Sequence, residues 1–83
     1  MIALRRRKDI MPQITVQMYP GRSDELKKKL ADALVKTAAE VLQRGPEHFS
    51  ASVQDVPQEE WTERVYKFAV DPNNKEVFVR PGY

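Results

Sequence analysis

Two segments of the chain alternate strictly between apolar and polar residues. The apolar positions of the two runs are Ile14, Val16 and Met18 in residues 13–19, and Phe49, Ala51 and Val53 in residues 49–54. A period of two places every apolar side chain on one face of a strand. We therefore expect two β-strands, each with one buried face, and we expect the first to end at Pro20-Gly21.

Between these runs the apolar residues recur every three or four positions. The apolar stripe consists of Leu26, Leu30, Leu34, Ala38 and the pair Val41/Leu42. Ser23 offers a hydroxyl to the free amides of a helix start, and Asp24 and Glu25 suit the positive end of the helix dipole. The pattern predicts a long helix that starts after Ser23 and ends at Gly45-Pro46.

Residues 13–54 thus read strand, long helix, strand, which is a β-α-β unit with parallel strands. One helix covers only one face of a two-stranded sheet and leaves the other face and both edges uncovered. We therefore expect an α+β fold that is completed by dimerisation through the exposed sheet face and edges.

The pattern is weaker after residue 56. Pro57–Glu60 is typical of the acidic first turn of a short helix, which would carry Trp61. Residues 65–70 are predicted to be extended, and residues 71–74 have the composition of a turn. Val77–Val79 is predicted to form a last short strand before an extended tail.

Composition excludes several classes of protein. The chain has 83 residues, enough for one domain, with no cysteine and a single histidine, His48. Disulfides, thiolate chemistry and a Cys/His zinc site are therefore excluded. We interpret His48 as a surface loop residue. Because no apolar run approaches the length of a membrane helix, we expect no membrane span and a cytoplasmic location.

The net charge of +2 is unevenly distributed. Residues 1–11 hold Arg5, Arg6, Arg7 and Lys8 against Asp9, whereas residues 12–83 carry 10 basic and 11 acidic side chains. We therefore divide the chain into a basic N-terminal extension, 1–11, and a domain, 12–83. The slightly negative domain argues against a nucleic-acid partner, although residues 5–8 could form a phosphate-contacting arm.

The order of features in the domain resembles the tautomerase superfamily typified by 4-oxalocrotonate tautomerase. Those proteins begin with a proline, pass through one strand, turn at a Gly-Arg-Ser and enter a long helix, as do Pro12, residues 13–19 and Gly21-Arg22-Ser23 here. The resemblance continues through Pro46-Glu47, Asp55-Val56-Pro57 and Trp61. The ending, with Val65-Tyr66 and Pro81-Gly82-Tyr83, is similar to a longer subgroup that assembles as dimers.

The resemblance implies a keto–enol tautomerase that needs no cofactor and no metal. Pro12 would be the catalytic base, since an N-terminal proline amine in a dry pocket near a cation has a pKa lowered toward neutrality. Arg22 would bind the carboxylate of a small enol or keto acid, and Trp61 would line the pocket.

Two departures from the family pattern change this expectation. Ala51 stands where the dicarboxylate tautomerases carry a second arginine, which favours a monocarboxylate such as an aromatic enol acid of the phenylpyruvate type. Pro12 is also not the first residue, and a proline nitrogen acylated by Met11 is an amide with no basic lone pair. Either translation properly starts at Met11, with methionine removal exposing Pro12, or the protein is a catalytically silent binding or interaction module of the same fold.

Overall fold

The structure is a computed structural model, and it describes residues 10–83. The basic side chains of residues 5–8 lie outside the described residues. The chain divides into two compact units: residues 10–16 with Arg22–Gln54, and Gln17–Gly21 with Asp55–Tyr83.

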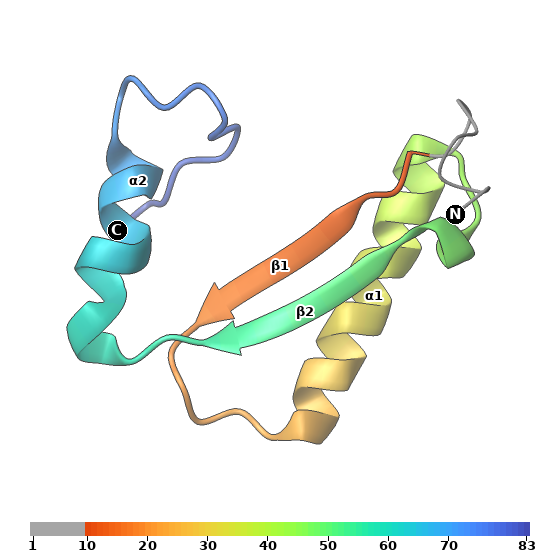
Figure 1. Cartoon of the computed structure of the whole chain (residues 1–83), viewed down its shortest axis with the longest axis horizontal. Coiled ribbons are helices and arrows are strands. Elements are labelled where there is room, and N and C mark those ends of the chain that lie inside the picture. The colour runs from red at the N-terminus through yellow and green to blue at the C-terminus, as the bar shows by residue number, and fades with distance from the viewer. Residues whose placement is uncertain (1–9) are drawn as a thin grey trace. The chain divides into compact units, whose positions relative to one another are not determined.

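The sheet contains two strands, β1 (Gln13–Met18) and β2 (Ser50–Asp55). The Ser50 N–H donates to the Pro12 carbonyl at 3.2 Å, and the Val56 N–H donates to the Met18 carbonyl at 2.8 Å. The same sequence offset separates both pairs, so the strands are parallel, as their arrows show in Figure 1. Half-buried and exposed residues alternate along both strands, which confirms the period-two prediction.

The long helix α1 (Asp24–Leu42) begins as predicted. The Ser23 hydroxyl accepts the Leu26 N–H at 3.1 Å. The predicted end at Gly45-Pro46 is wrong, because Gln43 itself adopts the left-handed cap conformation at φ 57° and the Arg44 N–H closes the last turn on the Ala39 carbonyl. Gly45-Pro46 instead opens the short 3₁₀ helix η2 (Pro46–His48).

The apolar stripe of α1 is covered in its middle and open at its ends. Leu30, Leu34 and Ala38 are half-buried, and Ala39 is the buried residue of the helix. Leu26, Val41 and Leu42, at the two ends, are 47%, 72% and 48% exposed. Nineteen helical residues span about 28 Å, whereas six strand residues span about 20 Å, so the helix ends extend past the sheet.

The second unit is mainly helical. Its turns are η3 (Gln58–Glu60), the π-helical η4 (Thr62–Tyr66) and α2 (Lys67–Val70). The short helix predicted after Pro57 is confirmed, and the prediction of extended chain at 65–70 is wrong. Two salt bridges, each between residues one helical turn apart, stabilise the helical conformation of this segment. They join Glu60 to Arg64 and Glu63 to Lys67, both at 2.8 Å.

The final segment contains the predicted turn but not the predicted strand. The Asn74 N–H donates to the Asp71 carbonyl at 3.0 Å, which confirms the turn at 71–74. Val77–Val79 is not a strand, because it has no strand partner among the described residues. Within residues 10–83 no helix is both long enough and apolar enough to cross a membrane.

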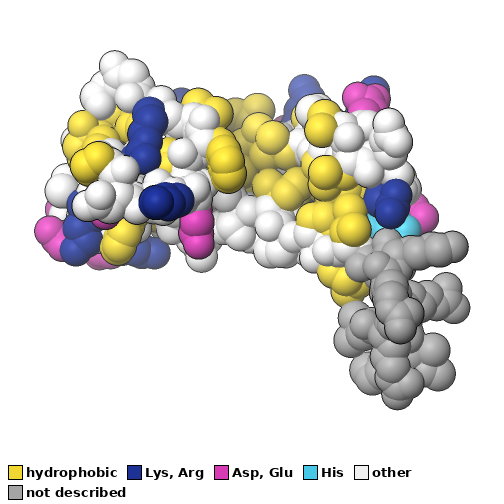
Figure 2. Space-filling model, turned by 90° about the horizontal axis from the view of Figure 1, so that it is seen from above, with side chains coloured by type: hydrophobic (Ala, Val, Ile, Leu, Met, Phe, Trp, Pro, Cys, Tyr) yellow, Lys and Arg dark blue, Asp and Glu magenta, His cyan; other side chains and the backbone are white. Residues whose placement is uncertain are grey.

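The described chain has a very small core. Only Ala39 and Val56 are buried among its apolar residues, at 9% and 0% exposure. Many apolar side chains lie open on the surface instead, as the yellow areas of Figure 2 show. So little burial is unusual for a small chain that has no cysteine and therefore no disulfide.

Candidate active site

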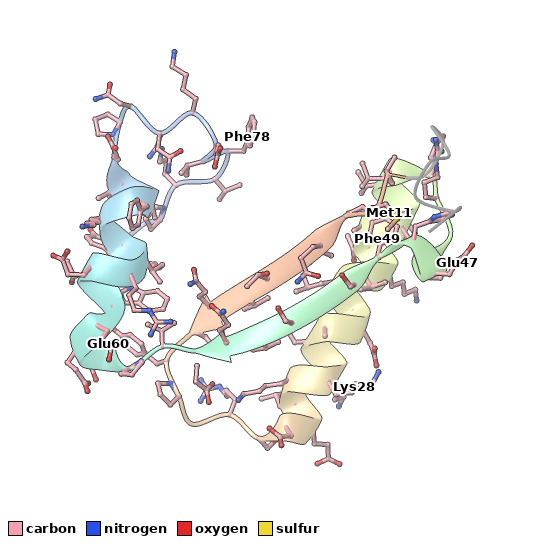
Figure 3. All side chains as sticks on the ribbon, in the orientation of Figure 1. Met11, Lys28, Glu47, Phe49, Glu60 and Phe78 are labelled. Carbon is pink, nitrogen blue, oxygen red and sulfur yellow. The ribbon has the colours of Figure 1, made fainter. Side chains whose placement is uncertain are left out.

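Pro12 lies directly before β1 and is half-buried. A proline suits this position because its missing N–H removes no bond from the ladder, while its carbonyl accepts from Ser50. Met11 precedes it with a φ of 50°, in the left-handed region that a non-glycine residue, and especially one before proline, rarely adopts. The backbone therefore turns sharply between Met11 and Pro12; Figure 3 labels Met11 at this end of the sheet.

Uncharged polar side chains form a hydrogen-bonded group beside Pro12 on the two strands. The Gln13 amide nitrogen donates to the hydroxyls of Thr15 and Ser52, both at 3.2 Å, and the Ser50 hydroxyl donates to the Gln13 amide oxygen. Sequence reasoning missed this group, although its signal was the row of uncharged polar residues on the second face of each strand. The group fixes the two strands relative to each other where Pro12 enters the sheet.

Arg22 lies on the connection from β1 to α1, one residue before the helix cap Ser23. Its side chain is exposed, and within residues 10–83 its guanidinium has no ion pair and no hydrogen bond. Gly21 precedes it at φ 124°, a conformation that glycine adopts without strain. The turn thus presents a charged fork without a partner, which suits recognition of a carboxylate.

Pro12 directly precedes β1, whereas Arg22 follows β1 on the connection to α1. The nine residues between them include the six of β1, which alone span about 20 Å. The structure therefore does not bring these two predicted site residues together within one chain.

Trp61 belongs to the second unit, between η3 and η4. Its half-buried indole meets the ring of Tyr19 edge to face, with centroids 5.1 Å apart and planes at 80°. The sequence pattern did not predict this contact of Tyr19, which is the last residue of the first alternating run. The π-helical turn directly after Trp61 is of a kind that is frequent at functional sites.

The sequence analysis also singled out Ala51 and His48. Ala51 is half-buried in β2, and its neighbours Ser50 and Ser52 lie exposed on the opposite face. His48 is half-buried in η2, not in a loop, with its Nε2 atom 3.8 Å from a carboxylate oxygen of Glu47. The described residues contain no group of three His, Cys, Asp or Glu side chains that could hold a metal ion.

One carboxyl group of the second unit has a perturbed pKa. A hydrogen bond from Lys67, and then the positive charge of Lys67, lower the pKa of Glu63 below its ordinary value. Glu63 is exposed on the surface of η4, so this shift belongs to a helix-stabilising pair and not to a catalytic acid.

Comparisons with known proteins identify the family. Residues 12–64 match the family model described as "Tautomerase enzyme". A probable tautomerase of Xylella fastidiosa (strain 9a5c) is 38% identical over 73 residues, which cover 88% of this chain and 89% of that protein. No solved structure gives a significant match. The family match and the relative agree with the resemblance of the motifs, and the chain belongs to the tautomerase family.

Proposed function

We propose that the protein is a cofactor-independent keto–enol tautomerase whose base is the amine of Pro12. The observation that carries the proposal is the family match, which begins at Pro12, the residue that leads into β1. A proline amine with a free lone pair takes a proton from the carbon next to a carbonyl and returns it to the enol at another atom. The domain of this enzyme is residues 12–83.

The chemistry requires that Pro12 be the first residue of the active protein. While Met11 is attached, the nitrogen is an amide and has no proton affinity at neutral pH. We propose that translation from Met11, followed by methionine removal, exposes the amine, and that residues 1–11 are absent from the active form. The match to the family model supports this boundary, because it begins at Pro12.

We propose a dimer in which each active site is shared by two chains. Pro12 and Arg22 are about 20 Å apart along β1, so one chain cannot offer both to one small acid. An antiparallel arrangement of two copies would bring Pro12 of one chain near Arg22 of the other. The very small core of the described chain also favours association.

The proposed substrate is a small enol or keto monocarboxylate. Arg22, which has no partner within residues 10–83, would hold the carboxylate. Ala51 has no positive charge to pair with a second carboxylate of the substrate. A dicarboxylate would therefore lose the hydration of that group on binding without gaining an ion pair at this position. Trp61, with Tyr19 against its ring, would form an apolar wall suited to an aromatic enol of the phenylpyruvate type.

A second candidate is a catalytically silent binding or interaction module of the same fold. The observation that favours it is the amide bond between Met11 and Pro12 in the chain as written. If this bond persists in the cell, no basic amine exists at Pro12.

Two forms of the protein separate these candidates. The short form starts at Pro12 after methionine removal, and the long form retains residues 1–11. On phenylenolpyruvate we expect the short form to turn over, with a rate that rises with pH as the amine loses its proton, and the long form to stay near background. Short-form Pro12→Ala keeps a primary amine and should be slower. Equal activity of the two forms would show that Pro12 is not the base, and inactivity of both on every enol acid tried would favour the silent module.

A further inference from the structure

Pro12 needs more than its own backbone to be held in place. In the proposed active form it is the first residue, and terminal residues fray unless other groups hold them. Within residues 10–83 its backbone has one hydrogen bond, in which the Pro12 carbonyl accepts the Ser50 N–H at 3.2 Å. The Pro12 nitrogen adds no second bond to β2, because it is an amide without hydrogen in the long form and the base in the short form. A base must nevertheless stay within a fraction of an ångström of its working position.

The side chain of Gln13, the next residue, reaches across to β2. Its amide oxygen accepts a hydrogen bond from the Ser50 hydroxyl, and its amide nitrogen donates to the Ser52 hydroxyl at 3.2 Å. Ser50 and Ser52 are 37 and 39 residues away along the chain. We call these two bonds the Gln13 cross-strand contact. Because one side chain bonds two positions of β2, the contact fixes the start of β1 along the strand direction as well as across it.

The amide group of Gln13 is oriented by its surroundings. Its nitrogen carries two hydrogens and has three acceptors within reach: the Ser52 hydroxyl, the Thr15 hydroxyl at 3.2 Å and the Ile14 carbonyl at 3.1 Å. The Ser50 hydroxyl donates to the amide oxygen on the other side. With acceptors around the nitrogen and a donor at the oxygen, the side chain is held toward β2.

Ser50 is a firm point of attachment because a closed turn leads into it. In η2 the Phe49 N–H donates to the Pro46 carbonyl at 3.1 Å, directly before Ser50. Ser50 then bonds the start of β1 twice, through its N–H to Pro12 and through its hydroxyl to Gln13. One main-chain and one side-chain bond together hold the segment in one orientation, whereas either bond alone leaves it free to rotate.

The Gln13 cross-strand contact lies on the open face of the sheet. Gln13, Ser50 and Ser52 are exposed, so water replaces these hydrogen bonds when they break. Such bonds contribute little to the stability of the whole fold. The contact therefore acts locally, on the end of one strand.

We propose that Gln13 is a positioning residue for the tautomerase reaction, and that its cross-strand contact holds the Pro12 amine in its working position. Gln13 does not touch the substrate in this role. The contact exists while Met11 is attached, so removal of residues 1–11 exposes an amine that is already in place. This role rests on the proposed function, in which Pro12 is the base.

Kinetics of the short form on phenylenolpyruvate test this role. Gln13→Leu keeps the approximate size of the side chain and removes its hydrogen bonds. We expect kcat to fall about tenfold, because the base spends less time in the productive position, while KM stays within about twofold of the wild type. The matched control, Thr15→Val, removes a neighbouring hydroxyl of β1 and leaves both bonds to β2 intact, so kcat should not change.

A double-mutant cycle identifies the bond involved. Ser50→Ala removes the hydroxyl but keeps the N–H that bonds Pro12, and it should lower kcat as well. Because Gln13→Leu and Ser50→Ala break the same bond, the double variant should lose little more than Gln13→Leu alone. Effects that multiply show that the two side chains act separately, and they overturn the cross-strand contact as the cause.

NMR measures the mobility of the first residues without any substrate. The ¹⁵N–{¹H} NOE of the backbone amides at positions 13 and 14 should fall in Gln13→Leu and stay at the wild-type value in Thr15→Val, while the midpoint of urea unfolding changes little. A wild-type short form that does not turn over refutes the proposed reaction and, with it, the role of Gln13. If the wild type is active, an unchanged kcat or an unchanged NOE in Gln13→Leu overturns the role of Gln13 alone.

Discussion

Replacement of Arg22 by alanine should weaken substrate binding without weakening the fold. The Arg22 side chain is exposed, and within residues 10–83 it makes no ion pair and no hydrogen bond. Removing it therefore breaks no contact of the described chain, and the free energy of unfolding should change by less than about 0.5 kcal/mol.

The effect on binding follows from the bond that Arg22 is proposed to make. A hydrogen bond to a charged group contributes about 1.5–3 kcal/mol, which corresponds to roughly ten- to a hundredfold in KM. If the contact tightens as negative charge develops on the substrate, kcat falls as well. Arg22→Lys keeps the charge but loses the two-pronged geometry, so its KM should lie between those of the wild type and Arg22→Ala.

Steady-state kinetics of the short form on an enol monocarboxylate measures this effect. Lys29→Ala is the control for general electrostatics, because it removes one positive charge from the first turns of α1. Its KM should stay within about twofold of the wild type at physiological ionic strength, where exposed charges are largely screened. Unchanged kinetics in Arg22→Ala, or an equal loss in Lys29→Ala, would refute the assignment of the carboxylate site.

Three further predictions concern stability and titration. Ser23→Ala removes the hydroxyl that caps α1 and should lower the free energy of unfolding by about 1 kcal/mol in urea denaturation, whereas Ser23→Asp should retain most of it. Val56→Ala opens a cavity at the only fully buried side chain among the described residues and should cost about 2 kcal/mol in the same assay; a loss below about 0.5 kcal/mol would contradict this packing. The pKa of Glu63, lowered by its hydrogen bond from Lys67 and then by the charge of Lys67, should rise in Lys67→Met when followed by carboxyl NMR. Because the folded pKa is the lower one, the stabilisation by this pair is present above the unfolded pKa and is lost as pH falls through the folded value.

The elements with a strong local period were predictable from the sequence. Alternation at Ile14, Val16 and Met18 fixed β1 to within one residue, and the Ser23 cap fixed the start of α1. The end of α1 was not predictable, because Gln43 adopts a left-handed conformation that composition assigns to Gly45.

The C-terminal third was predicted less well for a physical reason. Residues 65–70 contain β-branched and aromatic side chains, yet salt bridges one turn apart and packing within the unit make them helical. Val77–Val79 has a strand composition but no strand to pair with among the described residues. A segment forms a strand only where another strand lies beside it, and the local sequence pattern does not specify the position of that second strand.

The candidate site was predictable as a set of residues but not as a geometry. Pro12, Arg22 and Trp61 were found from the order of family motifs, yet nothing in that order indicates that Pro12 and Arg22 occupy opposite ends of one strand. Tyr19 was missed because an edge-to-face contact with Trp61, 42 residues away in the chain, leaves no local pattern.

The most direct test of the proposed tautomerase is the titration of Pro12 in the short form. A protein labelled with ¹⁵N-proline allows the pKa of the Pro12 amine to be measured by NMR, alongside the pH dependence of kcat/KM on phenylenolpyruvate. We predict that kcat/KM rises with pH as the amine loses its proton and that both curves report one pKa, lowered toward neutrality. If kcat/KM does not follow the titration of the Pro12 amine over the pH range in which the protein stays folded, Pro12 is not the catalytic base.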